Sequence, residues 1–372
     1  MLKNHLQTLA AVRAGRIDCQ AFAYQEAFDE EGHSYDANRL KRFRLLLALQ
    51  YDRSEQDEPL LQKLMRQETI MHRHAPFQGL YPSLCLCAYL LSRFRSPMNV
   101  WLFTQAKLSN FDTHCGFDVQ YLVSAGIEET YRYVVDAEHE WKSTFYDYVG
   151  EDRENCRINS SDLTRWREAK EKQYPSQLDM ENIEDVIELA IDLEEKELLQ
   201  EKVREWKSQQ KDWDETTLNQ LVVYERHCDN VAGVIAAQEE LLRYKTTDWD
   251  IASQLRSLSE WYLKLGEADV AWAKIDTARH HLQHIPDWKR VGLGRMIVEN
   301  AFDVVLLQND ANHPTCRVAY EWALEQIQAL EGPHLNLLQK AAEAADIMGD
   351  ERMEEQFLTA YVEEEKRIYD ED

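Results

Sequence analysis

The segment from Trp101 to Thr130 combines apolar residues with side chains that could take part in chemistry. An aspartate, a histidine and a cysteine buried within a few residues of one another could supply a nucleophile and its base. The same groups could instead form the polar part of a small-ligand pocket. The segment therefore makes an enzyme or a small-molecule receptor one candidate function, and its candidate ligand-binding residues are Lys107, Asp112, His114, Asp118 and Gln120.

A structural role explains these residues as well, and we favour it. Asn110 to Thr113 can form a loop and helix cap, with the Asp112 carboxylate accepting hydrogen bonds from free backbone N–H groups. The chain also contains no phosphate-binding loop, dinucleotide-binding fingerprint, nucleophile elbow or His-Glu-x-x-His zinc motif. We therefore predict no catalytic residue and no cofactor, and we favour a binding protein over an enzyme.

Histidines and cysteines at short spacing are the candidates for metal ligands. His280 and His284 are one helical turn apart, a spacing at which two imidazoles can reach one metal ion. They also come just before Pro286, at the end of an expected helix, where histidines interact favourably with the helix dipole. The pairs His72/His74 and Cys85/Cys87 are spaced by two, so on helices their side chains point about 200° apart. We therefore predict no metal site.

The elements that must position these residues are predicted to be helices. The chain has 372 residues but only 12 Gly and 8 Pro, too few turn residues for a fold of many strands. Ten Trp, seventeen Tyr and eleven Phe supply ample apolar surface for burial. We expect an all-α fold, with residues 1–30 as a helical hairpin broken at Gly15 and helices near 60–73, 82–95 and 97–108.

The amino-terminal residues show no signal-peptide pattern, and no segment approaches the roughly 20 apolar residues needed to span a bilayer. Seven cysteines, an odd number in a long chain, are typical of reduced thiols. These features predict a cytoplasmic protein that is not bound to membranes.

A polar, aliphatic-poor stretch marks the expected domain boundary. It contains Gly150 and then Asn159-Ser160-Ser161-Asp162, a plausible helix cap. We expect a helical N-terminal domain over 1–150, a polar linker and capping helix over 151–178, and a third region over 179–372.

The third region carries a repeated pattern, clearest between Ala252 and Pro286. Small and apolar residues there fall at the positions used by the tetratricopeptide repeat, with Gly266 in the turn: Leu255, Leu258, Ser259, Tyr262, Ala271, Ile275 and Ala278. Residues 335–366 are similar, and segments 183–208, 214–244 and 297–331 have the length of helix pairs. The chain thus resembles the tetratricopeptide-repeat superfamily. The resemblance implies an α-solenoid of antiparallel helix hairpins that binds proteins or peptides on its concave face.

Acidic residues concentrate in the second part of the chain. Residues 1–150 contain 16 Lys and Arg against 19 Asp and Glu, a balance of −3, whereas residues 151–372 contain 26 against 49, a balance of −23. Such a surface repels nucleic-acid phosphates and anionic lipids. A basic or amphipathic segment of another protein is the expected partner. Two alternatives remain: the acid serves solubility only, or the chain is an immunity or inhibitor protein that imitates nucleic acid.

The last helix is expected to form a solvated polar cap, because the chain ends in a run of acidic residues.

Overall fold

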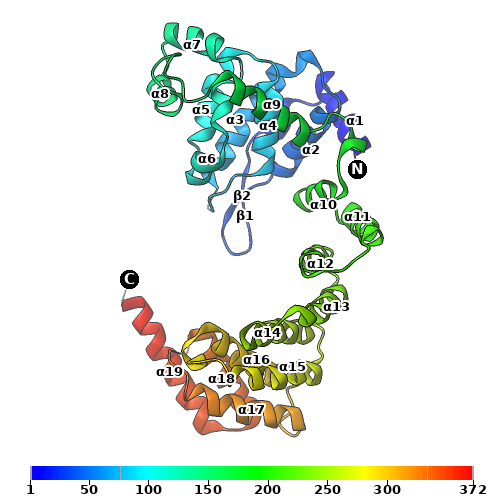
Figure 1. Cartoon of the computed structure of the whole chain (residues 1–372). Coiled ribbons are helices and arrows are strands. Elements are labelled where there is room, and N and C mark those ends of the chain that lie inside the picture. Colours follow the sequence, from blue (N-terminus) through cyan, green and yellow to red (C-terminus); the bar gives the residue numbers. More distant parts are fainter. Residues whose placement is uncertain (1, 76, 333, 371–372) are drawn as a thin grey trace. The chain divides into compact units, whose positions relative to one another are not determined.

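The computed structural model describes residues 2–75, 77–332 and 334–370, and it is mainly helical, as predicted (Figure 1). The α-helices of the described residues are α1 (Leu2–Arg13), α2 (Arg39–Tyr51), α3 (Glu58–His74), α4 (Pro82–Ser92), α5 (Val100–Lys107), α6 (Phe111–Gly116), α7 (Ile127–Asp136), α8 (Lys142–Val149), α9 (Ser160–Gln173), α10 (Ile183–Asp192), α11 (Lys196–Gln209), α12 (Glu215–His227), α13 (Val231–Leu241), α14 (Asp248–Lys264), α15 (Ala268–Leu282), α16 (Gly292–Gln308), α17 (Pro314–Ile327), α18 (Leu335–Met348) and α19 (Glu351–Asp370). Short 3₁₀ segments cover Cys19–Phe22, Glu55–Asp57, Pro97–Asn99, Val119–Val123, Leu178–Met180, Leu242–Tyr244 and Trp288–Arg290. The predicted helices near 60–73, 82–95 and 97–108 correspond to α3, α4 and α5.

The prediction of a helical hairpin over residues 1–30 is wrong. After α1 and the break at Gly15, the chain forms a two-stranded antiparallel hairpin of β1 (Glu26–Phe28) and β2 (Ser34–Asp36). The Asp29 carboxylate accepts hydrogen bonds from the backbone N–H groups of Glu31 and His33, which reverses the chain before Gly32. Side-chain bonding of this kind favours a turn over a continued helix.

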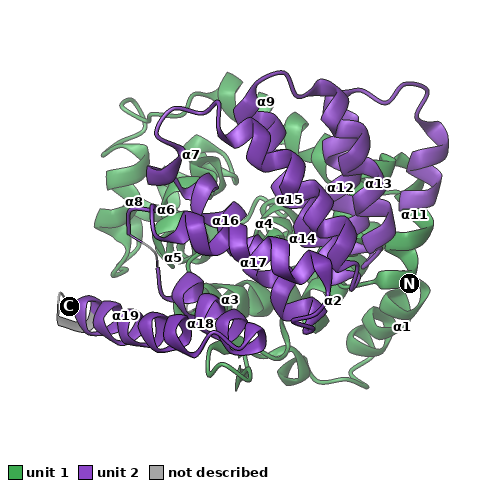
Figure 2. Cartoon of the chain, turned by 90° about the horizontal axis from the view of Figure 1, so that it is seen from below, with its two compact units in different colours: residues 1–202 green, residues 203–372 purple. Residues whose placement is uncertain are grey.

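The chain divides into two compact units, residues 1–202 and 203–372 (Figure 2). The predicted linker over 151–178 lies within the first unit. Its helix α9 begins at the predicted cap residue Asn159 and buries Leu163 in the core of that unit. The guanidinium of Arg53 donates to the carbonyl oxygen of Tyr174, just after α9, at 2.9 Å. The polar composition of 151–178 therefore reflects the exposed surface of α9, and it does not mark a domain boundary.

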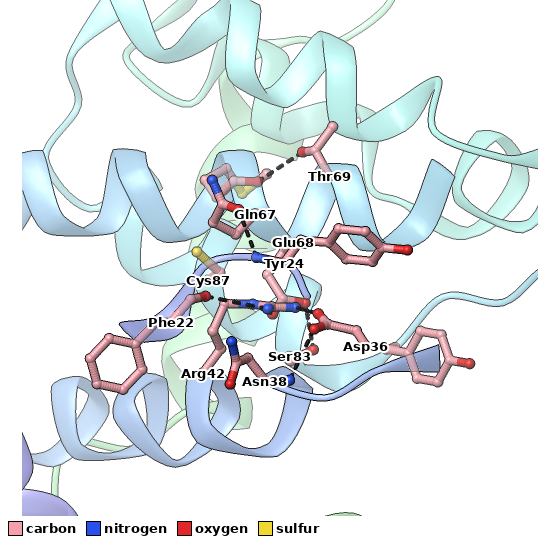
Figure 3. A network of polar contacts seen from close by, with 12 residues as sticks. Phe22, Tyr24, Asp36, Asn38, Arg42, Gln67, Glu68, Thr69, Ser83 and Cys87 are labelled. Carbon is pink, nitrogen blue, oxygen red and sulfur yellow. Dashed lines mark hydrogen bonds and ion pairs between the residues drawn. The ribbon is translucent and has the colours of Figure 1, made fainter. Parts of the chain in front are cut away.

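The first unit contains a guanidinium that is entirely shielded from water (Figure 3). The Arg42 side chain lies 2.6 Å from the Asp36 carboxylate and 2.8 Å from the Glu68 carboxylate, and all three side chains have no exposed surface. These groups come from α2, β2 and α3. A buried charge is tolerated only when it is paired and hydrogen-bonded. Because the partners of Arg42 come from β2 and α3, the ion pairs hold the hairpin against the two helices.

Further donors complete the cluster around the two carboxylates. The Ser83 hydroxyl of α4 donates to Glu68 at 2.6 Å. The backbone N–H groups of Gln25 and Asn38 each donate to Asp36 at 3.0 Å. The cluster therefore joins β2, α2, α3 and α4, which follow one another along the chain.

His72 borders this cluster in a neutral form. Its Nδ1 lies 2.7 Å from the carbonyl oxygen of Glu68, and its Nε2 accepts a hydrogen bond from the backbone N–H of Tyr81 at 3.1 Å. A carbonyl only accepts and an N–H only donates, so the tautomer with its proton on Nδ1 satisfies both partners. Burial lowers the pKa of His72, in agreement with this arrangement.

The second unit consists of helix pairs that pack in sequence order. The helices of each pair α12/α13, α14/α15, α16/α17 and α18/α19 contact one another, and α16 also packs against α14 and α18 (Figure 1). Buried alanines fill the seams, among them Ala252, Ala271 and Ala278, with no exposed surface. Gly266 and Gly349 lie in the turns with positive φ, which glycine adopts without strain. The helix pairs predicted over 214–244, 252–286, 297–331 and 335–366 are therefore present.

Close backbone contact and polar bonds reinforce these seams. A Cβ on Gly294, at the start of α16, would lie 2.2 Å from the carbonyl oxygen of Trp288. The buried Asn300 amide donates to Ser259 of α14 at 2.8 Å. The Lys340 ammonium of α18 pairs with both Glu299 and Asp303 of α16 at 2.8 Å.

None of the helices in the described part of the chain combines the length and apolar character of a membrane span. All seven cysteines are unpaired thiols.

Candidate functional site

Lys107, the first of the predicted site residues, reaches from α5 to the end of α6. Its ammonium donates to the carbonyl oxygens of His114 and Phe117, both at 2.7 Å, and lies 5.1 Å from the centroid of the Tyr148 ring. A cation at this position offsets the partial negative charge of the unpaired carbonyls at a helix C-terminus. Burial lowers the pKa of Lys107. This contact is a structural bond between helices.

Asp118 binds α9 to the rest of the first unit. Its carboxylate accepts from the indole N–H of Trp166 at 2.9 Å and pairs with the Lys170 ammonium at 2.8 Å. Both partners belong to α9, so Asp118 binds a different element from the one that Lys107 binds.

The cap of α6 is not the predicted one. The side chain of Asn110, rather than Asp112, accepts from the backbone N–H of Thr113 at 2.8 Å, and the Thr113 hydroxyl accepts from the Asn110 N–H at 2.9 Å. Asn110 precedes the helix and can aim its side chain at these free groups, whereas Asp112 already lies in the first turn.

The remaining two predicted residues lie apart. His114 is exposed and contacts the Tyr148 hydroxyl through Nδ1. Gln120 is half-buried in the 3₁₀ segment Val119–Val123. The structure thus brings Lys107 and His114 together beside Tyr148 and directs Asp118 elsewhere.

The candidate metal ligands on α15 have other contacts. His280 Nδ1 lies 2.6 Å from the carbonyl oxygen of Asp276. His281 and His284, the pair that do share a partner, approach the Asp248 carboxylate at 2.7 and 3.6 Å. Within the described residues, no three His, Cys, Asp or Glu side chains converge as a metal site.

The two short-spaced pairs of the first unit are also separated. His72 is held by backbone groups, as described above, while the His74 ring lies 5.4 Å from that of Tyr24. Cys87 is buried, and burial raises the pKa of Cys85 to about 11, so both thiols stay protonated at neutral pH.

A groove with an apolar floor and both acidic and basic side chains beside it follows the line where α14 and α16 pack together. It has a volume of about 640 Å³. Its lining residues are Glu260, Leu263, Lys264, Asp303, Leu306 and Leu307. The Lys264 ammonium lies over the Trp261 ring, 4.1 Å from its centroid. We call this the α14–α16 groove.

A second groove, the α18–α19 groove, has a volume of about 430 Å³, an apolar floor and an acidic rim. Its carboxylates come from Glu343, Asp346 and Glu354, and its apolar surface from Ala342, Leu358 and Tyr361, beside Gln339. None of these lining residues is basic. Leu358 is 50% exposed, although it lies in a helix whose other side is buried in the core.

The last helix is more apolar on its surface than a polar cap. Leu358, Val362 and Ile368 of α19 are all exposed large apolar side chains. Glu351, Glu354, Glu355 and Glu363 line the hollow that contains Leu358 and Val362. The exposed surface of α19 is otherwise mostly charged and polar, so these side chains form an apolar strip between acids.

The concentration of acidic residues was predicted from the sequence, but the apolar floors of the two grooves were not. The leucines of the α14–α16 groove come from two helices about 40 residues apart, so no local pattern joins them. A signal did exist in α19, where Leu358 and Val362 repeat at a spacing of four among glutamates.

The second unit carries 18 Lys and Arg against 33 Asp and Glu, a balance of −15. Comparison of the chain with protein-family models, curated proteins and solved structures gave no match.

Proposed function

We propose that the second unit is a tetratricopeptide-like helical repeat that binds a basic, amphipathic segment of another protein. The observation that carries the proposal is the α18–α19 groove, whose lining combines apolar side chains with three carboxylates and no basic residue. An amphipathic helix places its apolar face in such a groove, and its lysines or arginines then meet the carboxylates.

The packing of the helix pairs supports the repeat. Glycine turns at Gly266 and Gly349 and buried alanines between paired helices are the features on which the resemblance rests. In such an array the first helices of successive pairs form one continuous face. Helices α14, α16 and α18 are those first helices, and the α14–α16 groove lies on them.

The negative charge gives the proposed binding its specificity. A balance of −15 over the second unit attracts cationic segments and repels anionic ones, an effect that salt screens beyond about 10 Å at 0.1 M. The bound state gains further from burial of apolar side chains, which salt does not weaken.

The first experiment uses the full chain and a fluorescent helical peptide with leucines on one face and lysines on the other. A second peptide carries glutamates in place of the lysines. We expect the lysine peptide to bind, with an affinity that falls as salt rises, and the glutamate peptide not to bind. Equal binding of the two peptides would refute the role of the acidic rim.

Matched variants locate the site. Glu343→Gln, Asp346→Asn and Glu354→Gln together remove the rim of the α18–α19 groove, and we expect about tenfold weaker binding or more. The control removes three exposed acids outside both grooves, Glu267→Gln, Glu321→Gln and Glu325→Gln, with the same change in net charge. An equal loss in both variants would show attraction by net charge without a specific groove.

A further inference from the structure

A basic cavity lies in the first unit, between the end of α4 and α9. It has a volume of about 270 Å³, and four of its nine lining side chains are positively charged: Arg93, Arg95, Arg167 and Lys170. Glu171 is the one carboxylate that lines it. Such a concentration of cations stands out in a chain with a net charge of −26. We call it the arginine cavity.

Three of these cations have no acidic partner. Lys170 is paired with Asp118 at 2.8 Å. Within residues 2–75, 77–332 and 334–370, no carboxylate lies within ion-pair distance of Arg93, Arg95 or Arg167. Arg167 donates to the carbonyl oxygen of Ser124 at 2.8 Å, which fixes its position and leaves other donors of the guanidinium available.

The frame of the cavity is built and not merely a chance meeting of surface side chains. Arg95 has a φ of 50°, a left-handed conformation that a non-glycine residue adopts only at a cost. The ring of Tyr89, which also lines the cavity, stacks on Tyr174 with centroids 4.9 Å apart. The Tyr89 hydroxyl is buried, its oxygen lies near the Arg53 guanidinium, and its proton has no acceptor among the described residues.

The electrostatics agree with this geometry. Burial, together with the charge of Arg95, lowers the pKa of Arg167. Burial and the charge of Arg93 likewise lower the pKa of Arg53, whose guanidinium lies 5.8 Å from the centroid of the Tyr89 ring. Glu129 and Glu171 act on Arg167 in the opposite direction. Excess positive charge remains, and a bound anion would relieve it.

We infer that the arginine cavity binds a small phosphate-bearing anion. Guanidinium groups match phosphate oxygens through two parallel hydrogen bonds, and the buried Tyr89 hydroxyl supplies one more donor. The volume suits a compact ligand, being slightly below the range of drug-sized sites. A nucleic acid would extend over the rest of the first unit, where 20 Lys and Arg face 34 Asp and Glu.

The test measures binding of pyrophosphate and of inorganic phosphate to the full chain by calorimetry and by the shift of its thermal transition. Pyrophosphate should bind with a stoichiometry of one, more tightly than phosphate, and raise the transition temperature. Arg93→Gln and Arg95→Asn should each weaken binding about tenfold. Both residues are exposed, and asparagine tolerates the left-handed backbone of residue 95.

Arg165→Gln is the matched control. Arg165 lies on α9 two residues before Arg167, but its side chain is 74% exposed and paired with Asp162 outside the cavity. We expect this variant to bind pyrophosphate like the native chain. Absence of saturable binding at millimolar pyrophosphate, an equal loss in Arg165→Gln, or tighter binding of citrate or of single-stranded oligonucleotides than of pyrophosphate would each overturn the assignment.

Discussion

The first unit buries a guanidinium and two carboxylates to hold its elements together, whereas the second unit is packed chiefly from alanine and other small apolar residues. In the first, Arg42 joins segments from β2 to α4 through directional bonds. In the second, α14 to α19 share one apolar core, and polar bonds such as that of Asn300 to Ser259 only supplement the contacts at its seams. The comparison shows two ways of fixing helices: through a few bonds that depend on every partner, or through many contacts that depend on size.

Loss of Arg42 tests the first of these ways and should have the largest effect. Arg42→Met leaves Asp36 and Glu68 buried without their cation, and we expect a loss of about 3–5 kcal/mol in the free energy of unfolding. Urea denaturation measures the loss, and hydrogen exchange of amides in α2 and α3 assigns it to the first unit.

The control is Arg132→Met, which removes a 70% exposed arginine that pairs with Glu128 one turn away. Surface pairs of this kind contribute at most about 1 kcal/mol. If Arg42→Met costs no more than the control, the buried cluster does not hold the unit together.

A methyl group at a seam tests the second way. Alanine normally stabilises a helix relative to glycine by up to about 1 kcal/mol. Gly294→Ala should instead destabilise the second unit by about 1–3 kcal/mol, because the new Cβ would meet the carbonyl oxygen of Trp288. Urea denaturation with hydrogen exchange of α16 provides the measurement.

Gly292, two residues earlier on the same helix, supplies the matched comparison. A Cβ there would come no closer than 3.8 Å to its nearest neighbour, the Met296 side chain. Gly292→Ala should be neutral or slightly stabilising. A similar effect of the two substitutions would mean that the space available between packed helices does not determine the stability of the second unit.

The smallest expected effect is the pH dependence that His72 gives to the first unit. Its pKa is lowered in the folded chain, so the unfolded chain takes up more protons as pH falls. Stability is therefore lost as the pH falls below about 6.5, the unfolded value. His72→Gln keeps one donor and one acceptor but does not titrate.

Urea midpoints above and below about pH 6.5 compare the native chain with His72→Gln. The native chain should lose more stability on acidification, while His5, whose pKa burial also lowers, leaves part of the dependence in the variant. An identical dependence in both chains would show that protonation of His72 does not contribute to the acid sensitivity of the first unit.

Local signals explain which parts of the fold were predictable. The helices and the turns at Gly266 and Gly349 follow from periodicity and from single glycines, which act over a few residues. The hairpin was missed because each of its strands has only three residues. The Arg42 cluster was missed because Arg42 and Glu68 are 26 residues apart on different helices. No local sequence pattern predicts contact between two such residues.

The candidate sites divide in the same way. Acidic composition indicated where negative charge accumulates, but the grooves depend on which leucines two helices bring together. The segment Lys107–Gln120 was a candidate site because of its residue types alone. In the structure, Lys107 and Asp118 bond with other helices of the first unit. The arginine cavity combines residues from α4, from the segment that follows it, from α9 and from the short segment before α7. No local sequence signal joins them.

Helix α18 keeps its packing residues and its rim residues on opposite sides. Ala341, Ala344 and Ala345 are fully buried, while their sequence neighbours Glu343 and Asp346 are exposed. Substitutions at the exposed positions leave the seams untouched. A scaffold of this kind can therefore acquire a new ligand preference by exchanging surface side chains, and reversing the charge of those two positions is a direct route to redesigning its selectivity.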